Sequence, residues 1–148
     1  MKVAVLMGSP SDEGKMEPAG TTLAEFGIEA DVRVMSAHRT PAVVAEFART
    51  ARGNGYAAII CGAGMAAHLA GAVAANTTLP VIGVPLSGGA LNGVDALYAT
   101  VQMPKGIPVA TVAIDGSANA GILVAEMLSI TDAGIAAQLT EFRAGGAR

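Results

Sequence analysis

The fold class is indicated by two stretches, Ala57-Ala58-Ile59-Ile60-Cys61 and Val81-Ile82-Gly83-Val84. Both are short and apolar throughout, as expected of strands that are covered on both faces. Outward from them, three more strands are predicted, at Lys2–Met7, at Val109–Ile114 and, from an alternating pattern, at Ala30–Met35. Strands that alternate with helical stretches predict a parallel sheet with right-handed crossovers and helices on both faces.

Helical spacing of apolar residues between these strands predicts six helices. They cover Asp12–Phe26, Pro41–Gly53, Ala66–Asn76, Asn92–Val101, Ala118–Leu128 and Asp132–Phe142. Pro18 falls inside the first, so we expect that helix to be kinked or split near Glu17. Because no linker or repeat interrupts the pattern, residues 1–148 are predicted to form a single α/β domain.

Composition excludes several classes of protein. Apolar residues make up 52% of the chain, yet no apolar run approaches the ~20 residues of a membrane span. Met1–Met7 is too short for a secretory signal and is predicted to be the first strand. One cysteine, Cys61, excludes an internal disulfide and suits a reducing cytoplasm. Its apolar surroundings predict a buried small residue rather than a reactive thiol.

Charge is sparse and spread along the chain. The net charge is −3 and the basic residues are scattered singly, which argues against nucleic acid or an anionic membrane as a partner. Charged residues amount to 14% of the chain, against about 25% in ordinary soluble domains. We therefore expect a homo-oligomer in which apolar surface is hidden between subunits.

The turn Ser36-Ala37-His38-Arg39-Thr40-Pro41 follows the predicted second strand. Thr40 is a natural N-cap for the next helix, and Pro41 suits the first helical position. His38 and Arg39 then lie at the carboxyl end of a parallel strand, where ligands bind in open α/β sheets. This position favours a functional site over a surface histidine beside a surface arginine.

Gly8-Ser9-Pro10-Ser11-Asp12 follows the first strand and leaves two interpretations open. Its glycine, hydroxyls and helix N-terminus could bind an anion such as a phosphate. Alternatively, Ser11 or Asp12 merely caps the helix. Since a carboxylate repels phosphate, Asp12 better suits a hydroxyl donor such as a ribose.

Small residues dominate the segment 62–71, which follows the third strand and contains Gly62, Gly64 and His68. They would let a helix N-terminus approach a ligand closely, but the spacing is not that of a dinucleotide-binding loop. His68 could equally be a hydrogen-bonded structural histidine. The next loop, 85–93, is flexible and polar enough to close over a site, although many linkers have the same composition. No metal-ligand spacing and no Ser-His-Asp arrangement stands out.

Taken together, these motifs resemble a known enzyme family. Met7–Asp12, Ser36–Pro41 and Gly62-Ala63-Gly64 with Ala66-Ala67-His68-Leu69 resemble class I 5-carboxyaminoimidazole ribonucleotide mutases of purine biosynthesis, as do Gly83-Val84-Pro85 and Leu91–Asp95. The resemblance spans nearly the whole chain. It implies a flavodoxin-like three-layer domain, an octamer, and transfer of a carboxylate from the exocyclic nitrogen of N5-carboxyaminoimidazole ribonucleotide to C4, without cofactor or metal.

The resemblance also implies roles for particular residues. His38 would be the general acid/base, and Ala37 would lie beside it in the substrate-binding turn. The ribose and phosphate would be held by Ser9, Ser11, Asp12, Ser36 and Arg39. The aminoimidazole ring and transient CO2 would lie against a wall formed by the segment 64–69, with Gly64, Ala66, Ala67, His68 and Leu69 as its site residues.

Two positions depart from the family pattern. Met65 and Ala70 replace the usual glycine and proline, and methionine would be strained if position 65 needs a positive φ.

Two rival functions remain. Class II relatives, which carboxylate aminoimidazole ribonucleotide directly with CO2, have lysine after the histidine; Arg39 and the His68 segment favour class I. A non-catalytic flavin or nucleotide-binding module would stack aromatic residues on its ligand, and the first four loops contain none.

Overall fold

The computed structural model describes residues 1–147, whose strands form a five-stranded sheet. Its strands are β1 (Lys2–Met7), β2 (Glu29–Val34), β3 (Tyr56–Gly64), β4 (Val81–Leu86) and β5 (Ala110–Thr111). All neighbouring strands pair in parallel, in the order β2-β1-β3-β4-β5. This is the flavodoxin-like order, and it confirms the fold class expected from the sequence.

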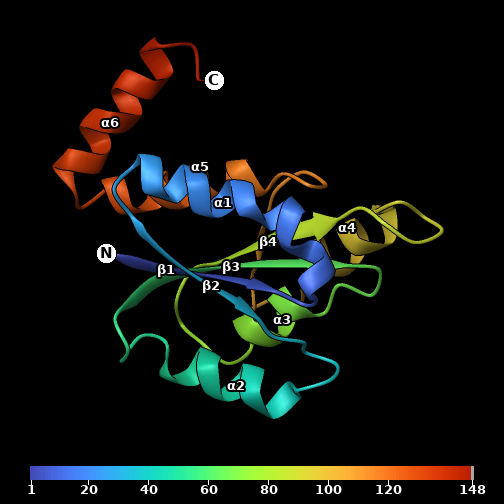
Figure 1. Cartoon of the computed structure of the whole chain (residues 1–148). Helices are drawn as coiled ribbons and strands as arrows, with labels where there is room; N and C mark the ends of the chain where they lie inside the picture. Colours follow the sequence, from blue (N-terminus) through green and yellow to red (C-terminus); the bar gives the residue numbers. More distant parts are fainter. Residues whose placement is uncertain (148) are drawn as a thin grey trace.

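In the described part of the chain, six α-helices and one 3₁₀ turn connect and cover the strands. They are the 3₁₀ turn Pro10–Asp12, α1 (Glu13–Glu25), α2 (Pro41–Thr50), α3 (Leu69–Ala74), α4 (Val94–Val101), α5 (Ser117–Ser129) and α6 (Ala133–Ala144). Helices α1 and α5 lie side by side on one face of the sheet, and α2 and α3 lie on the other (Figure 1). Helix α6 extends outward from the end of α5, and its Phe142 packs edge-to-face on Phe26 at the end of α1.

Successive side chains of β1 point to opposite faces of the sheet and join two separate hydrophobic cores. Val3, Val5 and Met7 pack toward α1 and α5, whereas Ala4 and Leu6 pack toward α2 and α3. None of these five side chains is more than 1% exposed. Each face of the central strand is therefore covered, as its apolar sequence requires.

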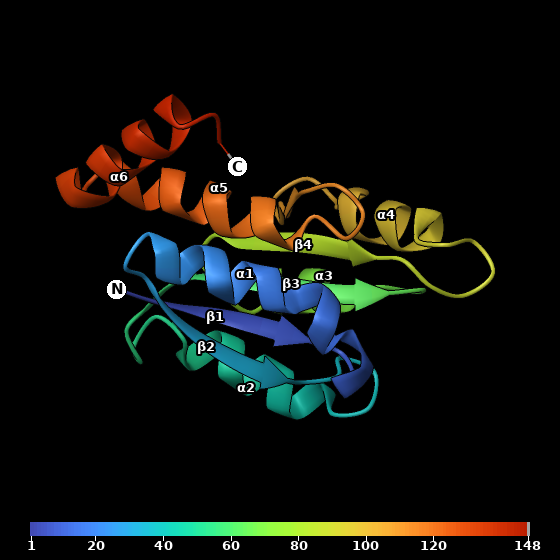
Figure 2. The same cartoon turned by 45° about the horizontal axis from the view of Figure 1, so that its top comes forward.

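The strand order places a crevice between β1 and β3. The chain leaves β1 for β2 on one side and returns to β3 on the other, so the crossovers diverge at this point. Figure 2 shows the long strands pointing toward the same end of the sheet, where their loops gather. In sheets of this kind, ligands bind at the carboxyl ends of the strands beside this switch point.

Several boundaries differ from those expected, and positive φ angles explain the late starts of two helices. Helix α3 begins at Leu69 rather than Ala66, because Met65 (φ 53°) and Ala67 (φ 26°) cannot join a right-handed helix. Helix α4 begins at Val94 rather than Asn92, which has a φ of 47°. These two helices are therefore shorter than their apolar patterns suggest.

The edge strand β5 is also shorter than expected. It pairs with β4 at Ala110 and Thr111 alone, not over Val109–Ile114. The Val112 amide still donates to the Gly83 carbonyl at 3.1 Å, after which a turn with Asp115 at φ 58° leads the chain away from the sheet. β3 and β4, by contrast, extend to Gly64 and Leu86, beyond their expected ends.

Pro18 does not split α1, which runs without a break from Glu13 to Glu25. Pro18 and Gly14, the residue four positions earlier, are both exposed. The carbonyl that loses its usual partner therefore faces solvent, where water can satisfy it. No helix within residues 1–147 is long and apolar enough to cross the membrane.

Candidate functional site

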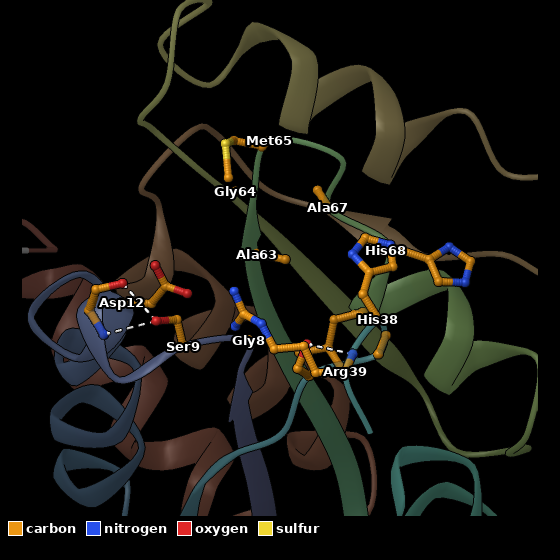
Figure 3. Close-up of a pocket in the computed structure, with 14 residues that line it drawn as sticks. Gly8, Ser9, Asp12, His38, Arg39, Ala63, Gly64, Met65, Ala67 and His68 are labelled. Atoms are coloured by element: carbon orange, nitrogen blue, oxygen red, sulfur yellow. Dashed lines mark hydrogen bonds between the residues drawn. The ribbon is translucent and has the colours of Figure 1, made fainter. Parts of the chain in front are cut away.

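Three loops at the carboxyl ends of β1, β2 and β3 surround a cavity of about 300 Å³. Figure 3 shows their side chains converging from separate elements. The lining residues are Gly8, Ser9, Ser11, Asp12, Ser36, Ala37, His38, Arg39, Ala63, Gly64, Met65, Ala67, His68 and Leu69. The fold therefore brings together the three segments that the sequence singled out, although they are separate in the chain, with 23 residues between Asp12 and Ser36.

The loop after β1 presents hydroxyls and a carboxylate. The Ser9 side chain caps the 3₁₀ turn by accepting a bond from the Ser11 amide at 3.3 Å, and the two serine hydroxyls lie 2.8 Å apart. Capping is therefore done by Ser9, not by Ser11 or Asp12. Asp12 makes no capping bond at the start of α1, which leaves its carboxylate on the cavity wall.

The loop after β2 is closed by its own hydrogen bonds. The Thr40 amide and hydroxyl both donate to the Ser36 carbonyl, at 2.8 and 3.0 Å, and the Arg39 amide donates to the Ser36 hydroxyl at 3.1 Å. Thr40 occupies the N-cap position of α2, as expected, but its side chain makes no capping bond because its hydroxyl closes the preceding turn instead. Pro41 does occupy the start of the helix, as expected. The closed turn fixes the backbone that carries His38 and Arg39.

The two histidines lie face to face at the cavity. The His38 and His68 ring centroids are 5.6 Å apart and the ring planes differ by only 7°. The rings come from different loops, after β2 and after β3, and Figure 3 shows them next to each other at one side of the cavity. The two imidazoles, carried by different loops, are therefore held against each other at the cavity.

The loop after β3 supplies a wall of small and apolar groups. Ala67 and Leu69 are both 2% exposed, whereas Met65 is 61% exposed and lies at the rim. Met65 has a φ of 53°, so the strain anticipated for a methionine at this position is present in the structure. The same backbone turn places Gly64 and Ala67 against the cavity.

Charge in the site is not neutralised internally. Within residues 1–147, neither Arg39 nor Asp12 forms an ion pair, although Asp31, Glu46 and Glu126 are each paired with an arginine. Burial raises the pKa of the Asp12 carboxyl above its ordinary value, and the Ser9 backbone and Lys15 offset part of that rise. The cavity therefore offers a fixed cation and a carboxylate to a polar ligand.

Eleven of the twelve residues expected in the site line the cavity, and one does not. Ala66 is exposed and lies outside the lining, because the turn at 65–67 directs it away. Ala63 lines the cavity although it was not among the expected site residues. The signal that could have found it is the length of β3, which continues past Cys61 and carries Ala63 to the edge of the sheet.

Two further observations concern other kinds of site. Cys61 is 1% exposed, and burial strongly raises the pKa of its thiol, which confirms the prediction of a buried, unreactive cysteine. Among residues 1–147, no group of three or more His, Cys, Asp or Glu side chains is placed to hold a metal ion.

Comparison with known proteins identifies the family to which this geometry belongs. The family model described as AIR carboxylase matches residues 2–148. The chain belongs to the AIR carboxylase family. A family relative from Vibrio vulnificus (strain CMCP6), named N5-carboxyaminoimidazole ribonucleotide mutase, is 52% identical over 145 residues, which cover 97% of this chain and 90% of that protein.

Other members of the AIR carboxylase family carry a different name or provide a solved structure. A Schizosaccharomyces pombe protein named phosphoribosylaminoimidazole carboxylase is 51% identical over 140 residues, covering 95% of this chain and 25% of that protein. The crystal structure of Treponema denticola PurE matches with a TM-score of 0.89 at 31% identity, over 99% of this chain and 91% of that one. The family resemblance seen in the motifs is confirmed.

Proposed function

We propose that this member of the AIR carboxylase family is an N5-carboxyaminoimidazole ribonucleotide mutase, an isomerase of de novo purine biosynthesis. It would move the carboxylate from the exocyclic nitrogen to C4, giving 4-carboxy-5-aminoimidazole ribonucleotide. The observation that carries this proposal is the cavity itself. The imidazole of His38 and the guanidinium of Arg39, which forms no ion pair within residues 1–147, share one closed turn that faces a wall of small residues.

Substrate binding is assigned to the polar side of the cavity. Ser9 and Ser11 present hydroxyls beside the N-terminus of α1, and Arg39 supplies a fixed positive charge for the phosphate. Asp12, as an acceptor, would bind a ribose hydroxyl. Ser36 keeps a hydroxyl proton to donate while its oxygen accepts from the Arg39 amide.

His38 is assigned the proton transfers. Its imidazolium gives a proton to the exocyclic nitrogen, the N–C bond breaks, and CO2 and the aminoimidazole remain in the cavity. C4 then attacks CO2 to form the C–C bond, and His38 takes the proton that C4 loses. The proton returns to its starting point, so the reaction is a net isomerisation that needs one acid/base group.

Holding CO2 beside the ring is assigned to the small wall. Gly64, Ala67 and Leu69 offer no charged group that would compete with the reaction, and Ala37 lies beside His38. Proximity alone makes the recombination step efficient. His68 is assigned an orienting role, because its ring is stacked on that of His38.

A direct carboxylase is the second candidate, and the name of the Schizosaccharomyces pombe relative favours it. Such an enzyme would take aminoimidazole ribonucleotide and CO2 and omit the first half of the sequence above. A flavin-binding module is less well supported, because no phenylalanine or tyrosine lies among the residues that line the cavity within 1–147.

We further propose that the protein is a homo-oligomer, an octamer as the resemblance implies, and that it works in the cytoplasm. An apolar stripe supports the oligomer: Leu91, Val94, Tyr98 and Val101 lie at helical spacing along α4 and just before it, each 44–62% exposed. A stripe of this kind is typical of surface that another chain covers.

The test of the proposed function compares two substrates under matched conditions. The protein is assayed with N5-carboxyaminoimidazole ribonucleotide, and separately with aminoimidazole ribonucleotide plus bicarbonate. The proposal expects the N5-carboxy compound to be by far the better substrate. Preference for aminoimidazole ribonucleotide plus bicarbonate would instead assign the direct carboxylase.

A further inference from the structure

The segment Ser87–Gly93, between β4 and α4, forms a loop with a closed neck. A Cβ added to Gly93 would lie 3.1 Å from Ser87 Cα and 3.3 Å from Ser87 N, so the two ends of the loop touch. Four of its seven residues have positive φ: Gly88 (143°), Gly89 (62°), Asn92 (47°) and Gly93 (94°). Compact loops of this length with adjacent ends are frequently functional.

Ser87 is the point at which this loop is fixed to the rest of the molecule. Its amide donates to Asp115 Oδ1 at 2.8 Å. Its carbonyl and hydroxyl oxygens both accept from the ammonium of Lys15, the hydroxyl at 2.9 Å. Every polar group of Ser87 therefore bonds to a residue far from it in sequence.

Lys15 is itself held in place at its backbone. The hydroxyl of Ser117, which is fully buried at the start of α5, donates to the Lys15 carbonyl at 2.6 Å. The Lys15 ammonium also lowers the pKa of two carboxyls on different elements. At Asp12 it offsets part of the rise in pKa that burial causes. At Asp115 it acts together with the Ser87 hydrogen bonds, and these lower the pKa more than burial raises it. One cation thus joins the start of α1 to the neck of the loop.

The tip of the loop reaches the substrate cavity through Met65. A Cβ added to Gly89 would lie 3.3 Å from Met65 Cγ and 3.5 Å from its Sδ, so the Met65 side chain lies against the Gly89 backbone. Met65 lines the cavity and is followed by the turn that positions Ala67. Figure 3 shows Met65 at the rim, beside the ribbon that passes above the site. A loose loop would therefore leave this wall without support.

We propose that Lys15 is a positioning residue that clamps the loop Ser87–Gly93 to α1, and that the clamped loop braces Met65 and with it the wall of the substrate cavity. Lys15 does not line the cavity, so it acts through the loop and not on the substrate. This inference rests on the proposed function only where it concerns substrate; the clamp itself does not depend on it.

The test compares Lys15→Met, which keeps side-chain length and loses the donors, with Lys105→Met, a change of the same kind at an exposed lysine. Hydrogen exchange followed by mass spectrometry measures the loop in the free proteins. Losing a charged hydrogen bond should speed exchange in the segment 87–93 by about tenfold or more, with β1 unchanged. With the N5-carboxy substrate, KM should rise roughly three- to tenfold while kcat changes less than twofold. Lys15→Arg should restore the exchange rate of the loop and KM toward those of the wild type.

The outcomes separate the clamp from the proposed function. Unchanged exchange in the loop of Lys15→Met overturns the clamp, and faster exchange with a KM equal to that of Lys105→Met overturns the positioning role. If the wild type does not turn over the N5-carboxy substrate, the proposed function fails while the exchange result still decides the clamp. Ser87→Ala removes one of the two acceptors of Lys15, so a smaller rise in the exchange rate of the loop and in KM is expected. This variant tests the clamp if Lys15→Met does not fold.

Discussion

Asp12 and Arg39 face one cavity without an ion pair between them or with any other residue in the range 1–147. The serine hydroxyls near them, by contrast, are used within their own loops: Ser9 with Ser11, and Ser36 with the Arg39 amide. The local bonds fix the loops, and the charged groups remain free for a ligand. Changes to these side chains should therefore affect binding or chemistry more than folding.

Replacing Arg39 with alanine should weaken nucleotide binding. A charge-assisted contact to phosphate contributes about 1.5–3 kcal/mol, which corresponds to a loss of roughly ten- to a hundredfold in affinity. Calorimetric titration with the product nucleotide measures the change. Arg49→Ala, at an exposed arginine of α2, is the matched control and should bind normally. Equal affinity of the two variants would remove Arg39 from the site.

Replacing His38 with asparagine should abolish most turnover and leave binding intact. Asparagine is similar in size but cannot titrate, so a loss of about 10²–10⁴-fold in kcat is expected if His38 is the general acid/base. Titration with nucleotide shows whether the site is still formed. His68→Asn is the control that separates the stacked rings; if it loses turnover while His38→Asn keeps it, the roles have been assigned to the wrong histidine.

Replacing Met65 with glycine should stabilise the protein slightly. The positive φ at this position is unfavourable for methionine and free of strain for glycine. After the entropy that glycine loses on folding, a gain of about 0.5–1 kcal/mol remains, or roughly 1–4 °C in Tm. Met65→Ala keeps the strain and should not raise Tm. A fall in Tm for both variants would show that the side-chain contact with Gly89 outweighs the strain.

At the scale of elements, the sequence predicts the sheet well but predicts the first residues of the helices poorly. The covered strands β1, β3 and β4 lie where apolar runs place them, because strands buried on both faces leave a clear signal. The edge strand β2 was found from its alternating pattern, and β5 is shorter than its apolar run. The starts of α3 and α4 were missed, because single positive φ angles at Met65, Ala67 and Asn92 carry no apolar pattern. The three loops of the site were found because each follows a strand, whereas the outward turn of Ala66 and the placement of Ala63 depend on backbone geometry.

The edge strand β2 contains an ion pair that predicts how stability depends on pH. Arg33 donates to both oxygens of Asp31, at 3.1 and 2.9 Å, and the Tyr56 hydroxyl also donates to this carboxylate. The Arg33 bond is the main reason why the pKa of Asp31 lies below its ordinary value of 3.8. A carboxyl with a lowered pKa in the folded state stabilises the fold above pH 3.8, and this contribution is lost as pH falls further.

Asp31→Asn should therefore lose less stability in acid than the wild type. Urea denaturation at pH 7, 5 and 3 measures the free energy of unfolding of both proteins. The wild type should be the more stable at pH 7 and 5, and the difference should shrink toward pH 3. A difference that stays constant across the three values would show that the ion pair does not stabilise the fold.

For the whole molecule, the sparse charge and the apolar stripe on α4 predict assembly. Light scattering should give a mass of several times 14.6 kDa, with eight copies as the resemblance implies. Tyr98→Asp, at the most exposed position of the stripe, should reduce the mass, because a charge would be buried in the interface. Ile130→Asp, at an exposed apolar residue outside the stripe, is the control. A monomeric wild type would contradict the oligomer.

The fate of the carboxylate distinguishes an intramolecular transfer from direct carboxylation. N5-carboxyaminoimidazole ribonucleotide labelled with ¹³C in its carboxylate is mixed with the protein in unlabelled bicarbonate, and the product is sampled within the first turnovers. If the cavity holds CO2 between the two steps, most of the product should keep the label at the carboxylate on C4. Product that carries the isotope composition of the bicarbonate would contradict an intramolecular transfer, and with it the mutase.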